Sequence, residues 1–380
     1  MRRIDRTRLV AAASGLALLG VVGPVAAQTN ASDPIKIGVI LPLTGAGAGL
    51  GIPSRNGILL AEKQINAAGG IKGRKIKVVI EDDTTNPDAA LNKANNLIFG
   101  EKVVALVGPI QTANTVAVGG ITAPVKFPQV ALGGLGPAVE LERKCVFHAA
   151  PPQNQNARAM LAYAKSLGVK NAAALYDSGY GTVVWNQLSK FAGEYGIKFG
   201  VTEKFEIAAT DTTPQAAKIR ASQPDAIFVI GVTGVPVRAI RQLQMKQPII
   251  AAIGQATYEI VKSMGDAAEG VVFPEFLVPE DPLPHQKAFV DAYKAEYGRA
   301  PKSIESIAYD ALKAMSQAIG KAGPEAGNEA ICAAMRGPYS GNSTEYDFSA
   351  PDMTGIKLNG FIYSKLVGGH FNRLPFKNAE

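Results

Sequence analysis

Residues 35–68 read IKIGVILPLTGAGAGLGIPSRNGILLAEKQINAA, and this stretch decides the fold. An apolar run over 35–41 ends at Pro42, and a glycine-punctuated turn separates it from apolar residues at helical spacing over 58–68. The pattern predicts a strand, a loop and a helix. In an open α/β sheet the ligand crevice lies at the carboxyl ends of the strands, so the loop over 44–53 is expected to form one wall of a binding site.

The glycines of this loop argue against the obvious rival, a dinucleotide-binding fingerprint. They alternate at Gly45, Gly47, Gly49 and Gly51, and no G-x-G-x-x-G can be placed on them. Neither a P-loop nor a nucleophile elbow occurs elsewhere in the sequence. We therefore expect no cofactor.

Residues 1–27 are predicted to be a cleavable secretory signal. Four Arg among the first eight residues precede an apolar run that ends in Val25-Ala26-Ala27, a small-x-small cleavage pattern before Gln28. No later stretch approaches the roughly eighteen apolar residues that a membrane helix needs. The mature chain is therefore expected to work in the periplasm.

Length and charge limit the class of protein. A chain of 380 residues exceeds one ordinary core, so two domains are expected. Loss of the signal removes four Arg and one Asp and lowers the net charge from +7 to +4. This mild excess contains no basic run and does not indicate nucleic acid binding. Cys145 and Cys332 lie far apart in the sequence; export allows a disulfide, but the sequence does not show whether they meet.

The alternation of strands and helices repeats along the chain. Up to residue 132 it reads β-α-β-α-β-α-β, and Asn86 followed by Pro87 marks the start of one helix. A second alternating series follows Pro151-Pro152, and helices resume after a proline-rich segment over 274–284. The tail is expected to end in a β-hairpin. The pattern predicts an α/β protein with two doubly wound, Rossmann-like lobes.

The chain is expected to cross between these lobes three times. Lobe 1 is predicted to contain residues 33–149 and 279–341, and lobe 2 to contain residues 150–278 and 342–380. Lobes that are joined by a few segments commonly close on a ligand by hinge motion. A cleft between the lobes is therefore the expected binding site.

Six segments carry a resemblance to a known family. They read IKIGVILPLTG (35–45), INAAGGIKGRKIKVVIEDD (65–83), VVALVGP (103–109), DSGYG (177–181), PDAIFVIG (224–231) and AAEGVVF (267–273). In these segments the chain resembles the periplasmic substrate-binding proteins of ABC importers, in the branched-chain amino acid (Leu/Ile/Val-binding) group with the type I periplasmic binding fold. The resemblance implies a receptor that traps a small solute and delivers it to membrane permease subunits. Members of the family take branched-chain amino acids, amides and urea, or aromatic carboxylates.

The resemblance also implies where ligand contacts fall. The positions that match the contacts of the family's amino-acid binders are Leu50, Ile110, Gln111, Thr112, Gly133, Gly134, Leu135 and Tyr180. Thr112 matches the hydroxyl donor that holds the ligand carboxylate. Its expected place at a helix N-terminus would let its O–H and backbone N–H groups receive an anion together. An ordinary N-cap threonine is the alternative.

Departures from the family pattern bear on the ligand. Amino-acid binders usually carry Ser or Thr where Leu135 stands, and an acidic partner for the ligand ammonium near Gln255. Burying an ammonium without a carboxylate costs several kcal/mol. We therefore expect a carboxylate with an apolar or aromatic body, with Gln255 and Tyr258 as further contacts. The alternative is a branched-chain or other neutral amino acid, or an amide, with Glu259 or Asp211 as the acidic group.

The sequence thus predicts a solute receptor and not an enzyme. No catalytic constellation of Ser, Cys, His and acidic residues can be assembled, and the three histidines lack metal-ligand spacing. A secreted α/β enzyme is the rival interpretation, and a ligand-sensing domain of a regulator is opposed by the signal and the missing DNA-binding head. The expected partners are a small carboxylate or amino acid and ABC permease subunits, and the chain is expected to be monomeric. His148, beside the first crossing, is a candidate to reach the cleft.

Overall fold

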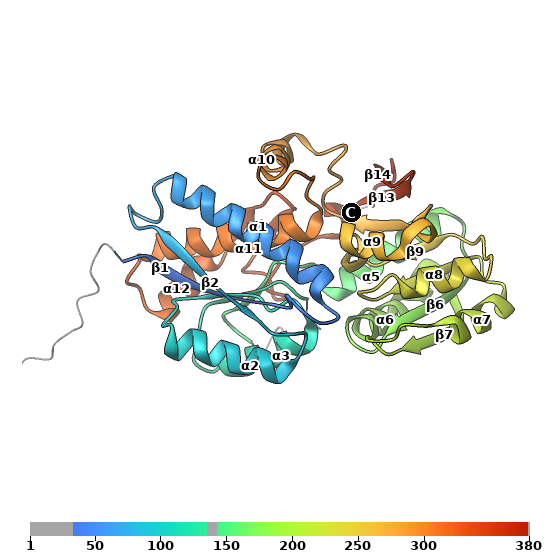
Figure 1. Ribbon diagram of the computed structural model, residues 1–380, viewed down its shortest axis with the longest axis horizontal. Helices are drawn as coiled ribbons and strands as arrows, with labels where there is room; N and C mark the ends of the chain where they lie inside the picture. Colours follow the sequence, from blue (N-terminus) through green and yellow to red (C-terminus); the bar gives the residue numbers. More distant parts are fainter. Residues whose placement is uncertain (1–32, 135–142, 379–380) are drawn as a thin grey trace, which may run out of the picture. The chain divides into compact units, whose positions relative to one another are not determined.

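The computed structural model describes residues 33–134 and 143–378 (Figure 1). The chain divides into two units, Met1–Asp33 and Pro34–Glu380, and the second unit carries all the elements given below. The signal predicted over 1–27 lies outside the described residues, and so does Leu135. Within the described ranges, no helix combines the length and the apolar character needed to cross a membrane.

A five-stranded parallel sheet forms first, in the order β2-β1-β3-β4-β5. Its strands are β1 Ile35–Leu41, β2 Ile76–Asp82, β3 Leu106–Val107, β4 Gln129–Ala131 and β5 Val146–His148. The sequence pattern predicts only four strands here. The fifth is β5, which continues the ladder beside β4, with His148 paired to Ala131. The chain therefore leaves this sheet only after residue 148.

Helices cover both faces of this sheet, which explains why β1 is a continuous apolar run. The helices are α1 Ala48–Ala67, α2 Pro87–Asn95 and α3 Thr112–Thr122, and a π-helical turn, η1 Asn96–Gly100, extends α2. The side chain of Asn86 caps α2 as predicted, by accepting the N–H groups of Asp88 and Ala89. A core cluster under α2 and α3 includes Ile40, while its neighbours in β1 face the larger core under α1.

The loop before α1 is shorter than the glycine pattern suggests. Helix α1 already begins at Ala48. Its first turn lies directly against the residue that follows β1, and Gly51 makes this close contact possible. A Cβ atom at Gly51 would lie 2.0 Å from the carbonyl oxygen of Pro42, so only glycine allows this approach. The alternating glycines therefore let a helix start close to the strand instead of forming a long loop.

A seven-stranded sheet follows, in the order β14-β13-β10-β9-β8-β6-β7. Its strands are β6 Asn171–Asp177, β7 Lys198–Phe205, β8 Ala226–Ile230, β9 Ile249–Ala251, β10 Val272–Glu275, β13 Ile362–Val367 and β14 His370–Arg373. The sheet is parallel up to β10, where β13 pairs antiparallel. The predicted terminal hairpin is confirmed as β13 and β14, and it joins this sheet.

Helices connect the parallel strands of the second sheet. They are α5 Gln153–Ser166, α6 Tyr180–Phe191, α7 Thr213–Ser222, α8 Val235–Gln242 and α9 Tyr258–Met264, with short 3-10 turns η2 Ala192–Tyr195, η3 Ile253–Gln255 and η4 Gly265–Ala268. Strand β9 ends at Ala251, and the turn η3 begins two residues later at Ile253. Helix α6 starts at Tyr180, directly after Gly179.

The chain then returns to the first sheet before it ends. Helices α10 Lys287–Tyr297, α11 Ser303–Ala322 and α12 Asn328–Met335 follow the 3-10 turn η5 Pro284–Gln286, and Figure 1 shows α1 and α11 side by side. A small hairpin, β11 Pro338–Ser340 and β12 Glu345–Asp347, and a turn, η6 Leu358–Gly360, precede β13. A disulfide joins Cys145 to Cys332 of α12, a pairing that the sequence left open.

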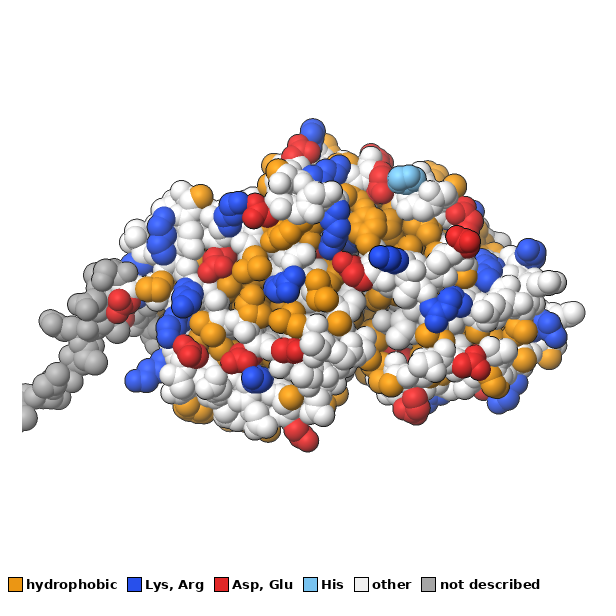
Figure 2. Space-filling view, in the orientation of Figure 1, with side chains coloured by type: hydrophobic (Ala, Val, Ile, Leu, Met, Phe, Trp, Pro, Cys, Tyr) orange, Lys and Arg blue, Asp and Glu red, His pale blue; other side chains and the backbone are white. Residues whose placement is uncertain are grey.

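Charged side chains are interspersed over the face that Figure 2 displays, where Lys and Arg alternate with Asp and Glu. The ion pairs of the described residues are mostly exposed and scattered, such as Lys36 with Glu101 and Lys287 with Asp291. The visible face carries no basic stripe of the kind that marks a nucleic acid binder. The mild positive charge is therefore dispersed on this face.

Candidate functional site

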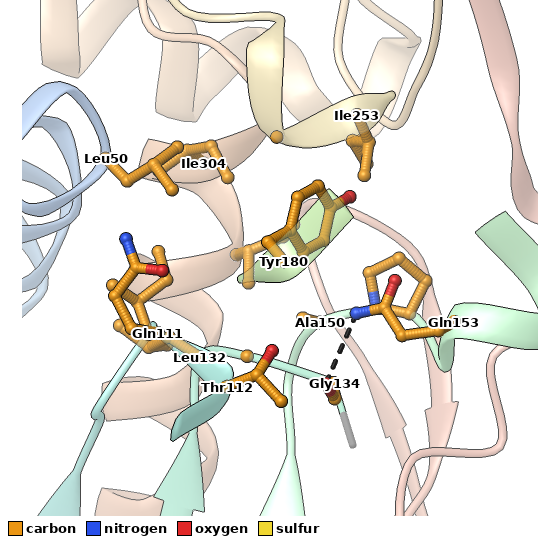
Figure 3. A pocket seen from close by; sticks show the side chains of 15 residues that line it. Leu50, Gln111, Thr112, Leu132, Gly134, Ala150, Gln153, Tyr180, Ile253 and Ile304 are labelled. Atoms are coloured by element: carbon orange, nitrogen blue, oxygen red, sulfur yellow. Dashed lines mark hydrogen bonds between the residues drawn. The ribbon is translucent and has the colours of Figure 1, made fainter. Parts of the chain in front are cut away.

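A cavity lies where loops of the two sheets meet (Figure 3). Its aliphatic walls are Leu50, Ile110, Leu132, Ile253, Ile304 and Ile307. Its polar side chains are Gln111, Thr112, Gln153 and Tyr180, and its remaining lining residues are Gly133, Gly134, Ala150, Pro151 and Gly254. Seven of the positions expected from the sequence are therefore brought together: Leu50, Ile110, Gln111, Thr112, Gly133, Gly134 and Tyr180.

Parallel strands explain why these residues meet. The carboxyl ends of such strands lie at one edge of a sheet, so the loops after β3 and β4 are neighbours there. The loop after β4 passes so close to other backbone that side chains are excluded. A Cβ atom added to Gly133 would lie 2.3 Å from the carbonyl oxygen of Ile110. A Cβ atom added to Gly134 would lie 2.6 Å from the carbonyl oxygen of Pro151. Backbone atoms therefore form this wall of the cavity.

Among the residues that the structure describes, five helices start at the cavity. Its lining includes the first residues of α3, α5 and α6, which are Thr112, Gln153 and Tyr180, and residues from the first turns of α1 and α11, which are Leu50 and Ile304. The first four N–H groups of a helix have no intrahelical acceptor, and each helix N-terminus carries about half a positive charge. Carboxylates already occupy two of these starts, since Asp177 accepts the N–H of Gly181 in α6 and Glu305 accepts the N–H of Lys302 before α11. The starts of α1, α3 and α5 are therefore the ones that favour an anion.

Gln111 supplies an additional donor. Its side chain is buried, and its Nε2 atom has no hydrogen-bond partner among the described residues. Figure 3 shows the amide nitrogen turned toward Leu50. Burying an amide N–H without a partner costs about 1–3 kcal/mol, so a ligand that accepts this hydrogen bond recovers that energy. Gln111 also holds the cap position of α3, which makes the neighbouring Thr112 the first helical residue and not the N-cap.

Tyr180 closes the opposite side of the cavity. Its Oη atom lies 2.8 Å from Nδ2 of Asn156, which is fully buried in α5. Burial raises the pKa of Tyr180, while hydrogen bonds from Asn156 and the Gly254 backbone act in the opposite direction. The phenol therefore stays protonated at physiological pH. Its ring stands over the cavity in Figure 3.

Three candidates from the sequence do not line the cavity. Asp211 is exposed and accepts the backbone N–H of Thr213 at 2.9 Å, which caps the start of α7. Gln255 is fully buried and donates to the carbonyl of Thr233 at 3.0 Å. Tyr258 packs edge-on against Phe371. Their predicted ligand contacts stay predictions.

Two further residues discussed from the sequence have other partners. Glu259, the alternative partner for an ammonium group, pairs with Arg299 at 3.1 Å and does not line the cavity. His148 is completely buried, and its Nδ1 lies 2.8 Å from the carbonyl oxygen of Gly133, a lining residue. Burial lowers the pKa of His148 to about 4, so its ring is neutral at physiological pH. His148 thus contacts the backbone of a lining residue and does not itself line the cavity.

The sequence did not point to Gln153, Ile304 or Ile307. Gln153 follows the Pro151-Pro152 segment, which was interpreted only as a crossing point. Ile304 and Ile307 lie in α11, far along the chain from the other walls, and apolar residues at this spacing also occur in any buried helix face. The one sequence signal for Gln153 was Pro152 directly before it, because Gln153 is the first residue of α5.

Comparisons with known proteins agree with this architecture. The family model described as "Periplasmic binding protein" matches residues 34–357. Leu/Ile/Val-binding protein homolog 7 of Brucella melitensis is 27% identical over 327 residues, which covers 80% of this chain and 82% of the relative. A leucine-, isoleucine-, valine-, threonine-, and alanine-binding protein of Pseudomonas aeruginosa is 28% identical over 320 residues, which covers 82% of this chain and 84% of the relative. The crystal structure of a leucine binding protein from Thermotoga maritima superposes with a TM-score of 0.83 at 26% identity, and the match covers 90% of this chain and 99% of that one.

Proposed function

The chain belongs to the periplasmic binding protein family, and from this premise we propose that it is the solute receptor of an ABC uptake system whose ligand is a small carboxylic acid with an apolar or aromatic body. One observation carries the choice of ligand. The described lining of the cavity contains aliphatic side chains, neutral donors and five helix starts, and no charged side chain. A carboxylate suits the donors, and an apolar body suits the walls.

The same cavity disfavours an ammonium group. Converging helix N-termini repel a cation, and an unpaired buried ammonium costs several kcal/mol. The acidic side chains considered from the sequence are engaged elsewhere, Asp211 in capping α7 and Glu259 in an ion pair. A carboxylic acid without an α-amino group avoids this cost. The proposal therefore places the ligand carboxylate near Gln111 and Thr112 and its body against the aliphatic walls.

A neutral amino acid is the second candidate. The names of the relatives from Brucella melitensis and Pseudomonas aeruginosa, at 27% and 28% identity, favour it. Leucine offers the carboxylate and the apolar body that the cavity suits. It would also need an acidic partner, and the described lining residues supply none. The two candidates thus differ in one chemical group, the ammonium.

Binding is proposed to couple to opening and closing of the walls. The cavity leaves about 40 Å³ for the centres of water-sized molecules, so little free space remains between the walls. A separation of the walls is proposed to admit the ligand. We assign residues 33–149 and 279–341 to one lobe and residues 150–278 and 342–380 to the other, so that Tyr180 closes over a ligand held first at Thr112. A ligand shifts this equilibrium only by its preference for the closed form.

The remaining assignments follow from the family. The receptor is proposed to act as a monomer in the periplasm after removal of residues 1–27, and to present its closed form to permease subunits. Binding and release, without bond chemistry, is the proposed activity. A secreted α/β enzyme with this cavity would need a nucleophile or an acid–base pair in it, and the described lining provides neither.

A thermal-shift panel on the chain from Gln28 onward tests the ligand class. Benzoate and cinnamate are compared with leucine, isoleucine, valine and small amides. A ligand at one hundred times its Kd adds about 2.7 kcal/mol to the free energy of unfolding, which raises the Tm by several degrees. We expect the aromatic acids to raise the Tm and the amino acids to leave it unchanged. A shift with leucine or valine alone would contradict the proposed class and favour the second candidate.

A pair of variants locates the carboxylate in the same assay. Thr112→Val removes the hydroxyl and keeps the shape of the side chain, while Thr112→Ser keeps the hydroxyl and serves as the matched control. Loss of a hydrogen bond to a charged acceptor costs about 1.5–3 kcal/mol, so the valine variant is expected to bind benzoate roughly tenfold or more weakly. The serine variant should bind nearly as the wild type does. Equal affinity in the two variants would show that the Thr112 hydroxyl does not bind the carboxylate.

A further inference from the structure

A chain of hydrogen bonds runs along one wall of the cavity. Nε2 of Gln153 donates to the carbonyl oxygen of Gly134 at 3.3 Å. Nδ2 of Asn156 lies 3.4 Å from Oε1 of Gln153 and 2.8 Å from Oη of Tyr180. Gln153 is 3% exposed and Asn156 is fully buried. The chain connects a backbone oxygen on one side of the cavity to the phenol on the other.

The carbonyl oxygen of Gly134 fixes the direction of the hydrogen bonds in this series. A carbonyl oxygen can only accept, so the atom of Gln153 that faces Gly134 must be the amide nitrogen. The amide oxygen of Gln153 then faces Asn156, where an oxygen would repel it and only the amide nitrogen fits. Nδ2 of Asn156 therefore donates to the phenol oxygen. Rotating either amide by half a turn would place two oxygen atoms against each other.

The phenol oxygen uses one lone pair to accept the N–H of Asn156 Nδ2 at 2.8 Å. A phenol oxygen also carries one hydrogen, and this hydrogen remains to be donated. Among the residues that the structure describes, no acceptor takes this hydrogen. Tyr180 lines the cavity, which makes a ligand the available acceptor.

We infer that Gln153 and Asn156 orient the Tyr180 hydroxyl so that it donates a hydrogen bond into the cavity, and that the ligand presents an acceptor oxygen to it. Tyr180 contacts the ligand, and the two amides act through Tyr180 as positioning residues. The inference deepens the proposed function and rests on it, since it adds a specificity requirement to the same site. Ligands that offer only an N–H group at this position leave the hydroxyl unpaired and are rejected.

Four forms of the chain from Gln28 onward test the inference, with benzoate as the probe in calorimetric titrations. Tyr180→Phe removes the hydroxyl and keeps the ring, so benzoate is expected to bind roughly tenfold more weakly. Asn156→Asp replaces the donor with a carboxylate, which accepts the Tyr180 hydrogen and withdraws it from the ligand. At pH 8 we expect Asn156→Asp to bind benzoate roughly tenfold more weakly, as Tyr180→Phe does. Asn154→Asp, on the same turn of α5, is the charge-matched control and is expected to bind as the wild type does.

A pH series separates positioning from a general loss of structure. Burial raises the pKa of a carboxyl group, so the carboxyl group that Asn156→Asp introduces should protonate as the pH falls from 8 to 5.5 and regain a hydrogen to donate. Benzoate stays ionised over this range. Affinity is therefore expected to recover toward low pH in Asn156→Asp and not in the control. Asp177 at the end of β6, and Arg158 of α5 with its partner Glu194 of η2, are charged groups that all four forms share. Their effects cancel in the comparison.

Two results would overturn the inference. One is wild-type affinity in Tyr180→Phe, and the other is the same pH profile in Asn156→Asp and Asn154→Asp. Melting curves without ligand check that each variant is folded, and Tyr180→Phe alone decides the donor role if Asn156→Asp fails to fold. If no aromatic acid binds the wild type, the proposed ligand class has failed. The four titrations are then run with leucine, whose carboxylate is also an acceptor, and the same outcomes decide the inference.

Discussion

Asp177 is a buried carboxylate that shapes the turn before Tyr180. Its Oδ1 accepts the backbone N–H groups of Gly179 at 3.0 Å and Gly181 at 2.6 Å. Its Oδ2 has no side-chain or backbone partner among the hydrogen bonds of the described residues. Burial raises the pKa of Asp177 to about 6, against the lowering effect of those backbone hydrogen bonds. Asp177 thus holds the backbone on both sides of Tyr180.

This pKa predicts the direction of a pH dependence. The folded-state pKa of Asp177 lies above the ordinary value of 3.8, so the folded protein binds the proton more tightly than the unfolded chain does. The contribution of Asp177 to the free energy of unfolding therefore falls as the pH rises from about 4 to about 6, by about 3 kcal/mol for a shift of roughly two units. Asp310 has a pKa of about 6 as well and acts in the same direction.

Urea unfolding from pH 4 to pH 8 separates the two carboxylates. Asp177→Asn keeps an acceptor for the glycine N–H groups and removes the titration. The variant is expected to gain stability relative to the wild type as the pH rises through this window. Asp310→Asn provides a comparison at a buried carboxylate away from the cavity. Parallel pH profiles for wild type and Asp177→Asn would show that Asp177 does not titrate in this range.

At the scale of elements, a buried ion pair connects β10 to the start of α11. Nζ of Lys302 lies 2.6 Å from a carboxylate oxygen of Glu275, and both side chains are completely buried. Ser303 adds to this junction, because its Oγ accepts the backbone N–H groups of Phe276 and Leu277. Since α11 packs on α1, the ion pair links the seven-stranded sheet to the helices that cover the five-stranded one.

Breaking this pair should be costly, because it leaves a buried charge without a partner. Lys302→Met is expected to lower the free energy of unfolding by about 3–5 kcal/mol. Replacing both partners, as Lys302→Met with Glu275→Gln, removes the two charges together and should recover part of that loss. Urea unfolding at pH 7 measures both variants. A double variant no more stable than Lys302→Met alone would show that the unpaired carboxylate is not the cause.

At the scale of the whole unit, the disulfide joins parts of the chain that are far apart in sequence. Cys145 precedes β5 and Cys332 lies in α12, at a sequence separation of 187. Most of the seven-stranded sheet is formed by residues between the two cysteines. The cross-link thus holds the returning helix α12 against the strand where the chain first leaves the five-stranded sheet. Such a bond is stable in the oxidising environment outside the cytoplasm.

Removing the cross-link should affect stability and leave binding intact. Replacement of both cysteines by serine is expected to lower the free energy of unfolding by about 2–5 kcal/mol, since the unfolded chain gains freedom. Neither cysteine lines the cavity, so the affinity for benzoate should not change. Urea unfolding and calorimetric titration of the same variant test the two statements. A large loss of affinity at unchanged stability would contradict both.

The sequence by itself determined the features that depend on neighbouring residues. Alternating apolar runs and helical spacing predicted nearly every strand and helix, and Asn86-Pro87 marked the start of α2 within one residue. The sequence placed Thr112 at the start of a helix that follows a parallel strand. The loops that follow parallel strands meet at the carboxyl edge of the sheet, and this holds without knowledge of the rest of the fold. Seven of the expected contact positions line the cavity for this reason.

Only the tertiary structure decided which distant segments reach the site. Ile304 and Gln153 line the cavity because α11 and α5 begin beside the loops that carry the other lining residues. Tyr258 packs on Phe371, and its ligand contact stays a prediction. Local patterns carry no information about which helix starts will converge, since that depends on strand order and on packing between helices far apart in sequence. The pairing of Cys145 with Cys332 and the direction of the hydrogen-bond chain to Tyr180 depend on the same long-range packing.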